Sequence, residues 1–240
     1  MLFRSAISNM VAAHMRELYH VPAERIRVVY NGVDVERFRP APDAAARSAL
    51  RRSLGVDQQT VFLIVALNFR LKGLDPLLAA FGTLRAQGHD AVLWVAGSGP
   101  VRKYRAVAAR HGCESAVRFL GPVADPVPYY QSADVYVQPT YYDPCSLVAL
   151  EAFGCGLPVI TTRHNGAGEL IHPWKEGVVL DEPDDVDGLV DAMNFYLDPR
   201  HRRCSSLAAR RLAERRSLGR NCEDLLALYR EAAIRRAAAA

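Results

Sequence analysis

Cysteine is scarce in this 240-residue chain, and no pair of the five residues, at positions 113, 145, 155, 204 and 222, has the spacing of a zinc site. An odd number of scattered thiols argues against a disulfide framework and favours a reducing compartment. Long apolar runs are also missing, and the first residues lack the apolar core of a signal peptide. We therefore expect a cytoplasmic protein that does not cross a membrane.

Acidic residues are few at the carboxyl-terminal end of the chain. Residues 200–240 hold eleven arginines against four acids, although the formal charge of the whole chain is only +4. Such a segment could bind an anionic membrane or nucleic acid. A simpler explanation of its many arginines is a solvated helical face, along which their aliphatic stems cover apolar surface. We expect no nucleic-acid partner and, at most, a peripheral contact with the inner face of the cytoplasmic membrane.

Two kinds of apolar run alternate along the rest of the chain. Continuously apolar or β-branched runs predict strands at 26–30, 61–67, 91–97, 117–121, 134–139, 158–162 and 178–180. Runs with helical period predict helices near 75–88, 101–112, 126–132, 146–156, 184–197, 203–216 and 221–236. This alternation is typical of an α/β fold, a Rossmann-like parallel sheet with helices on both faces.

Polar or glycine-rich segments follow five of the predicted strands, at 68–73, 97–100, 121–125, 139–146 and 162–169. Ligands of such sheets bind beyond the carboxyl ends of the strands, where these segments converge. Turns alone would need glycine and proline but no paired charges. The sequence therefore predicts a binding site at this edge of the sheet.

Two cations, Arg70 and Lys72, stand in the first of these segments, just before a predicted helix. Cations beside a helix N-terminus make a site for an anion, and a diphosphate is the expected ligand. Gly97 and Gly99 follow another strand, and we include both among the candidate binding residues. A lone G-x-G is a weak fingerprint that a tight turn also explains, so a dehydrogenase is disfavoured.

Two carboxylates flank the start of the predicted helix at 146–156. Asp143 precedes it, and helix capping by Asp143 or Ser146 is a sufficient structural explanation. Glu151 lies inside the helix, where a buried unpaired carboxylate would cost several kcal/mol. Ribose hydroxyls would supply the donors that it needs. We expect Asp143 to hold sugar hydroxyls, Glu151 to hold the ribose, and the amides of residues 145–147 to bind phosphates.

Two further groups are weaker candidates. Asp185 and Asp187 form a D-x-D pattern, but carboxylates at a helix start also favour the helix dipole, and we expect no metal site. His164 is suited to act as a base, but the sequence pairs it with no acid, and a loop histidine is the equal alternative.

Taken in order, these segments resemble the C-terminal, donor-binding domain of the family 4 glycosyltransferases, which have the two-domain GT-B fold. The resemblance covers residues 6–198 and rests on IRVVYNGVDVERFRP, NFRLKG, WVAGSGP, VRFLGPV, EAFGCGLPVITT, NGAGEL and the spacing Asp143-x7-Glu151. It implies retaining transfer of a hexose from a nucleotide diphosphate sugar, usually a UDP-sugar, without a metal or further cofactor. The Arg-x-Lys loop is most similar to that of the lipopolysaccharide-core glucosyltransferases, which implies a glycan or lipopolysaccharide-type acceptor.

The resemblance also implies roles for single residues. Arg70 and Lys72 would stabilise the charge on the leaving diphosphate, and Asp143 would hold the donor sugar. The remaining roles are the ribose for Glu151 and the phosphates for the backbone amides of Ser146 and Leu147. The family usually has Glu in place of Asp143 and Gly in place of Ser146; both departures bear on the donor sugar rather than on the reaction class.

We expect three segments: a remnant of an N-terminal domain with the interdomain linker (1–40), the nucleotide-sugar-binding domain (41–200), and helices that cross back to the N-terminal domain (201–240). The acceptor site belongs to that other domain, so we expect a fragment that binds donor and transfers little; a natural short protein is the alternative. Two other functions stay open: a sugar-nucleotide epimerase or phosphorylase of the same fold, and a non-catalytic nucleotide-sugar-binding module.

Overall fold

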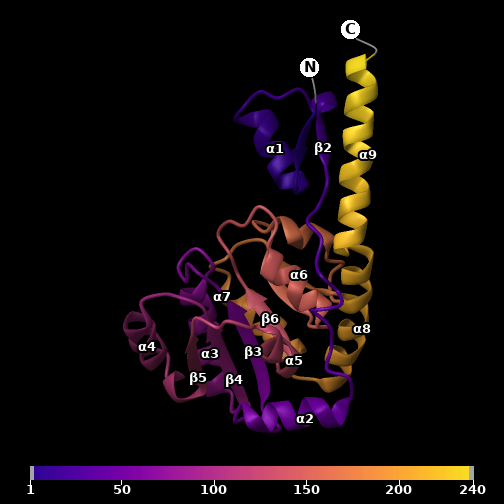
Figure 1. Cartoon of the computed structure of the whole chain (residues 1–240). Helices are drawn as coiled ribbons and strands as arrows, with labels where there is room; N and C mark the ends of the chain where they lie inside the picture. Colours follow the sequence, from indigo (N-terminus) through magenta and orange to yellow (C-terminus); the bar gives the residue numbers. More distant parts are fainter. Residues whose placement is uncertain (1–2, 238–240) are drawn as a thin grey trace.

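A computed structural model describes residues 3–237 of the chain (Figure 1). Residues 1–2 and 238–240, the outer ends of two predicted segments, lie outside the described residues. The centre is a parallel sheet of six strands in the order β5-β4-β3-β6-β7-β8. Its strands are β3 (Thr60–Val65), β4 (Ala91–Ala96), β5 (Val117–Gly121), β6 (Val135–Gln138), β7 (Val159–Thr162) and β8 (Gly177–Leu180). The predicted α/β fold with a Rossmann-like parallel sheet is confirmed.

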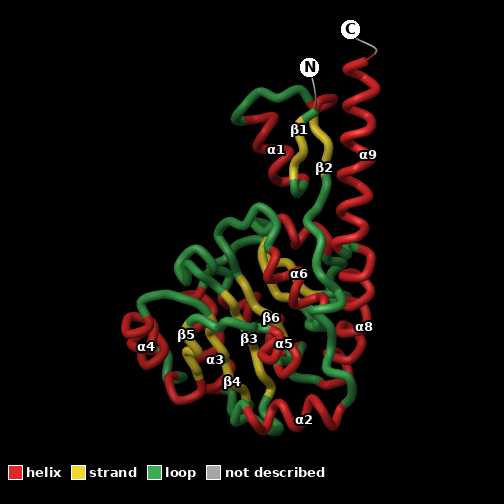
Figure 2. The backbone as a smooth tube through the Cα atoms, viewed as in Figure 1, coloured by secondary structure: helices red, strands yellow, loops and turns green. Residues whose placement is uncertain are grey.

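Helices cover both faces of the sheet, and the strands lie between them (Figure 2). Successive side chains of β3 enter two different cores, because a strand directs neighbouring side chains to opposite faces. Phe62 and Ile64 pack with α3 (Leu74–Ala86), α4 (Val101–Arg110) and α7 (Val186–Phe195). Val61 and Leu63 pack with α5 (Val127–Ser132), α6 (Leu147–Gly154) and α8 (Pro199–Arg215). Among the N-terminal residues 3–28, Ile7 packs against the second of these cores.

The order of the strands changes direction between β3 and β6. From β3 the chain adds β4 and β5 on one side, and it then returns to add β6, β7 and β8 on the other. The helices that follow β3 and β6 leave on opposite faces, so the carboxyl ends of these two neighbours border a crevice. The segments after β3 and after β6 are those that carry the predicted charged residues.

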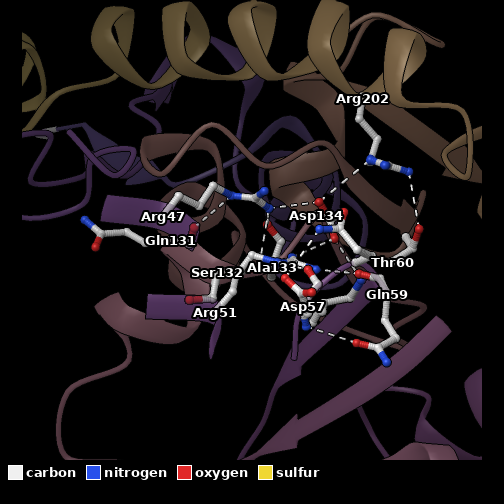
Figure 3. A network of polar contacts seen from close by, with 12 residues as sticks. Arg47, Arg51, Asp57, Gln59, Thr60, Gln131, Ser132, Ala133, Asp134 and Arg202 are labelled. Atoms are coloured by element: carbon white, nitrogen blue, oxygen red, sulfur yellow. Dashed lines mark hydrogen bonds and ion pairs between the residues drawn. The ribbon is translucent and has the colours of Figure 1, made fainter. Parts of the chain in front are cut away.

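Asp134 stands just before β6, at the opposite edge of the sheet (Figure 3). Its carboxylate accepts hydrogen bonds from Arg47 at 2.8 Å and Arg51 at 3.1 Å, and Nε of Arg202 lies 3.7 Å away. The amide of Val61 donates to the same carboxylate at 2.8 Å. The arginines come from α2 (Ala44–Ser53) and α8, so this network fastens both helices to the sheet.

The N-terminal residues form a separate small unit beside α9 (Leu218–Ala237), away from the main sheet (Figure 1). In it, β1 (Arg4–Ala6) pairs in parallel with β2 (Ile26–Val28), and α1 (Asn9–Glu17) connects them. The predicted strand at 26–30 is confirmed, but it pairs outside the main sheet. β1 is not among the predicted strands, because a strand of three residues carries too little pattern to be recognised.

Three short 3₁₀ helices complete the described structure: η1 (Ala23–Arg25), η2 (Glu114–Ala116) and η3 (Gly166–Leu170). η3 follows β7, and it lies against both the N-terminal unit and the segment after β6. Glu169 in η3 accepts hydrogen bonds from the amides of Asn9 and Met10, and the hydroxyl of Ser8 donates to the carbonyl of Pro144 at 2.7 Å. The start of α1 is thereby held against the predicted site.

Candidate functional site

The segments after β3 and β6 meet through an ion pair. Nζ of Lys72 donates to Oδ2 of Asp143 at 2.7 Å. The close approach of the two segments depends on Gly73, whose φ is 75°, because a Cβ there would lie 1.9 Å from the carbonyl oxygen of Pro139. The structure therefore brings together two of the residues that the sequence predicted.

Asp143 is buried, and hydrogen bonds hold both its backbone and one oxygen of its carboxylate. Oδ2 accepts from Lys72 and also from Nε2 of Gln138, at 3.3 Å. The backbone of Asp143 bonds to the carbonyl of His164 and the amide of Gly166, each at 2.9 Å. Among residues 3–237, nothing is hydrogen-bonded to Oδ1. One carboxylate oxygen is thus left to accept from a ligand, beside a cation.

Ser146 begins α6, as the capping argument predicted. Its hydroxyl oxygen accepts from the amide of Ala149 at 3.4 Å, and the hydroxyl itself donates to Oε1 of Gln138 at 2.9 Å. The amide of Ser146, however, donates to Oδ1 of Asn165 at 3.2 Å. The expectation that this amide is free for a phosphate is therefore wrong. Leu147 follows in the first turn, where helix amides have no intrahelical partner, and it stays a candidate.

Glu151 lies half-buried on α6, and one of the donors that it was expected to need comes from the protein itself. The hydroxyl of Tyr130 donates to its Oε2 at 3.0 Å. Burial raises the pKa of Glu151, whereas the Tyr130 hydrogen bond and the positive charge of Arg37 act in the opposite direction. No hydrogen bond reaches Oε1 from the described part of the chain. The carboxylate therefore keeps the capacity to accept from one more hydroxyl group.

A cavity of about 350 Å³ opens beside Lys72, at the carboxyl ends of β3 and β4. Its wall is largely apolar and is formed by Val65, Ala66, Leu67, Asn68, Lys72, Gly97, Pro122, Val123 and Val148. Gly97 has a φ of 120°, and a Cβ there would lie 1.8 Å from the carbonyl oxygen of Ala66. At Gly99 a Cβ would lie 2.3 Å from the ring of Phe69. Close packing alone thus explains both glycines, while Gly97 also borders the cavity.

Arg70 is exposed and borders a different cavity, of about 560 Å³. The other residues around that cavity are Asn68, Leu71, Asp75 and Tyr141. The structure therefore brings Lys72, and not Arg70, into contact with Asp143. The two cations border two neighbouring cavities, which share Asn68.

The weaker candidates have ordinary structural roles. Asp185 caps α7, and its Oδ1 accepts from the amide of Gly188 at 2.9 Å. His164 does have an acidic partner, which the sequence did not reveal: Glu182 lies 3.2 Å from its Nε2. This hydrogen bond holds the pKa of the exposed Glu182 below its ordinary value. Within residues 3–237 no three His, Cys, Asp or Glu side chains are grouped as metal ligands would be.

Two residues at the site escaped the sequence analysis. Gln138 ends an otherwise apolar strand, and Asn165 is fully buried in the loop after β7. Asn165 Oδ1 accepts from Ser146 and from Ala167, and its Nδ2 donates to Thr161 at 3.1 Å. The position of Gln138, a polar residue at the end of a buried apolar strand, could have indicated a role at the site. Asn165 opens the NGAGEL motif within the predicted segment 162–169, but neither pattern indicated that its side chain holds Ser146.

A family model described as glycosyl transferases group 1 matches residues 58–198, more than half of the chain. The chain belongs to this family. A second model, described as glycosyltransferase family 4, matches residues 5–37. The group 1 match contains Lys72, Asp143 and Glu151, so all the candidate residues lie within the part that defines the family.

Curated relatives of this chain are longer proteins. A D-inositol 3-phosphate glycosyltransferase of Saccharomonospora viridis is 35% identical over 239 residues, which cover 94% of this chain and 54% of the relative. A GDP-mannose-dependent alpha-(1-6)-phosphatidylinositol monomannoside mannosyltransferase of Mycolicibacterium smegmatis is 34% identical, over 88% of this chain and 58% of the relative. The chain thus spans about half the length of the curated relatives it matches.

Two solved structures share the fold of this chain. WaaG, a glycosyltransferase involved in lipopolysaccharide biosynthesis, superposes with a TM-score of 0.79 at 26% identity, over 88% of this chain and 58% of WaaG. HepE of Anabaena, in complex with UDP-glucose, superposes with a TM-score of 0.82 at 23% identity, over 95% of this chain and 63% of HepE. No helix within residues 3–237 is long and apolar enough to span a membrane.

Proposed function

We propose that this chain is the donor-binding half of a retaining hexosyltransferase, and that a nucleotide diphosphate sugar binds in the crevice between β3 and β6. The observation that carries the proposal is the pair formed by Lys72 and Asp143. It sets a cation and a carboxylate oxygen without a partner side by side, at the start of α6. A diphosphate needs the first group and sugar hydroxyls need the second.

The parts of the donor can be assigned by chemistry. The largely apolar cavity beside Lys72 suits a flat nucleobase, and its opening next to Val148 leads toward α6. Glu151 takes the ribose, because Oε1 is still able to accept from a hydroxyl group. The diphosphate lies at Lys72 and at the first-turn amide of Leu147, where the helix dipole favours negative charge. Asp143 binds the transferred sugar through Oδ1.

The reaction requires charge stabilisation more than covalent chemistry by the protein. When the bond between the sugar and the diphosphate breaks, negative charge develops on the leaving phosphate. Lys72 stabilises that charge from a partly buried position, where its effect is stronger than in water. Arg70 acts from the exposed side of the same loop and contributes less. In this proposal neither a metal ion nor another cofactor is required.

For the donor we propose a UDP-hexose, with GDP-mannose as the competitor to be tested. The resemblance of the Arg-x-Lys loop supports the first, as does HepE, a protein of the same fold that is known with UDP-glucose. The name of the mycobacterial relative, which is GDP-mannose-dependent, supports the second. The proposed acceptor is a glycan or a lipid-linked glycan, reached at the inner face of the cytoplasmic membrane.

We further propose that a second domain covers α9 and supplies the acceptor site. Leu218, Leu226 and Tyr229 share one face of α9 and are 48%, 52% and 67% exposed. A stripe of this kind on a long helix favours a protein partner. The relatives are about twice as long as this chain, and the small unit of β1, α1 and β2 lies beside the same helix. The segments 1–40 and 201–240 are then the two connections to that domain.

Calorimetric titration of the chain with UDP, UDP-glucose, GDP-mannose and ADP-glucose tests the proposal. We expect saturable binding of one nucleotide, weakened roughly tenfold or more by Lys72→Ala and by Glu151→Gln. Lys175→Ala and Glu214→Gln are matched controls, because both residues lie outside the crevice, and we expect less than about twofold change. An affinity that neither Lys72→Ala nor Glu151→Gln changes would show that the site is wrongly assigned.

The same titration separates a transferase from a non-catalytic binding module only when turnover is also measured. The N-terminal half of a relative, added or fused ahead of residue 3, should allow transfer that Asp143→Asn abolishes. Donor binding without transfer in such a fusion would favour the binding module.

A further inference from the structure

Gln138, the last residue of β6, is fully buried in a strand whose other residues are Val135, Tyr136 and Val137. Burying a side-chain amide costs free energy unless both of its ends are hydrogen-bonded. The roles assigned above to Asp143, Lys72 and Glu151 give no reason for an amide at this position.

Both ends of the Gln138 amide are hydrogen-bonded, and the partners lie in the proposed site or beside it. Oε1 accepts from the hydroxyl of Ser146 at 2.9 Å and from that of Tyr136 at 3.2 Å. Nε2 donates to Oδ2 of Asp143 at 3.3 Å. A carboxylate can only accept, so Asp143 determines which way the amide points. Gln138 therefore links the sugar-binding carboxylate to the first residue of α6.

We propose that Gln138 is a positioning residue for the donor sugar, which holds Asp143 and the start of α6 in one fixed geometry. The inference rests on the proposed function, and Gln138 itself does not touch the donor. Its importance arises when the donor binds. The diphosphate of the bound nucleotide sugar attracts Lys72. The amide of Gln138 then still donates a hydrogen bond to Oδ2 of Asp143, so that Oδ1 stays directed to the sugar.

The two side chains that contact the Gln138 amide support this role. Asp143 and Ser146 are both hydrogen-bonded to Gln138. A carboxylate that needs a fixed position and a serine hydroxyl that needs an acceptor are thus satisfied by the same amide.

The substitutions Gln138→Met and Gln138→Glu test the proposal, with the ratio of the affinities for UDP-glucose and UDP, or for GDP-mannose and GDP, as the readout. Because Asp143 binds only the sugar, we expect Gln138→Met to lower this ratio roughly tenfold at every pH. Gln138→Glu should lower it at about pH 8, where two carboxylates repel each other, and restore it at about pH 5.5, where the introduced group is protonated and donates to Asp143.

Tyr136→Phe is the matched control, since it removes one hydroxyl from Oε1 of Gln138 and leaves the contact with Asp143 intact. We expect the ratio to change by less than about twofold. A ratio that is unchanged in Gln138→Met, or that falls equally in Tyr136→Phe, would overturn the proposal, because Gln138 would then be a packing residue only.

A measurement without ligand keeps the inference separate from the proposed function. The unfolding free energy of Gln138→Glu, relative to the wild type, should rise as the pH falls from about 8 to 5.5, since the pKa of the introduced group is raised by Asp143 and by burial. Adding Asp143→Asn should flatten this dependence. The same dependence in both variants would overturn the link between Gln138 and Asp143, whereas wild-type protein that binds no nucleotide would contradict only the proposed function.

Discussion

β6 has an aspartate near each end, and the two carboxylates are bound in opposite ways. Asp134, at the amino-terminal edge of the sheet, has both oxygens engaged by arginines and accepts a backbone amide as well. Asp143, at the other edge, has both of its donors on Oδ2 and none on Oδ1 within the described residues. A saturated carboxylate stabilises the fold, whereas one with a spare oxygen can bind a ligand.

Cavity size alone would favour the opposite edge of the sheet. The cavity beside Asp134 measures about 790 Å³ and the one beside Lys72 about 350 Å³. Yet Arg47 and Arg202, which border the larger cavity, already donate to backbone carbonyl groups as well as approaching Asp134. The smaller cavity is bordered by Lys72, whose partner Asp143 has one carboxylate oxygen to spare, and it is the better candidate for that reason.

The largest effect should come from Asp134→Ala. Arg51 is 5% exposed, and its charge would be left without a carboxylate partner. We expect the free energy of unfolding in urea to fall by about 3–5 kcal/mol, as when one partner of a buried ion pair is removed. A fall below about 1 kcal/mol would mean that the network in Figure 3 is not what fastens α2 and α8 to the sheet.

Asn165→Ala should have the next largest effect, at the opposite edge. The substitution leaves the amides of Ser146 and Ala167 without their acceptor and removes the donor to the hydroxyl of Thr161. We expect a loss of about 1–3 kcal/mol in the same urea titration, with faster hydrogen exchange at Ser146. Unchanged exchange at Ser146 would show that another group holds this amide.

Glu151→Gln should reveal a smaller, pH-dependent difference. The pKa of Glu151 is raised in the folded protein, so its contribution to stability is fully present below the unfolded pKa, about 4.3, and is lost as the pH rises through the folded pKa. Between about pH 4 and pH 7, the wild type should therefore lose stability relative to the variant. The opposite slope would mean that the carboxylate form is the one stabilised by folding.

The smallest effect should come from Asp125→Ala, which removes an exposed ion pair. Asp125 and Arg37 lie 3.4 Å apart, and their side chains are 60% and 54% exposed. We expect a change within about 0.5 kcal/mol, declining further in high salt. A loss as large as that of Asp134→Ala would remove the distinction between saturated buried carboxylates and exposed ones.

The fold was largely predictable because its strands are buried on both faces. Continuous apolar runs identified β3 through β8 to within two residues at either end, since a parallel sheet covered by helices leaves no polar face to confuse the pattern. α2 was missed even though Asp43 caps it, accepting from the amide of Ala46 at 2.8 Å. Its outward-facing, arginine-rich sequence has no broad apolar stripe, so its position depends on the network around Asp134.

The site was predictable in its residue types but not in its partners. Lys72, Asp143 and Glu151 were recognised because charges are unusual in segments that otherwise only turn the chain. Their surroundings were not, since Gln138 contacts Asp143 and Asn165 contacts Ser146 only once the chain is folded. The different surroundings of Arg70 and Lys72 likewise follow from the path of one short loop, which sequence spacing does not describe.

The central claim is tested most directly by one pair of identical substitutions at the two ends of β6. Asp134→Asn and Asp143→Asn are each titrated by calorimetry with the nucleotide sugar that binds the wild type, under conditions where both variants are folded. The account predicts a loss of roughly tenfold or more for Asp143→Asn and less than about twofold for Asp134→Asn. Equal losses in the two variants, or wild-type protein that binds no nucleotide sugar, would contradict it.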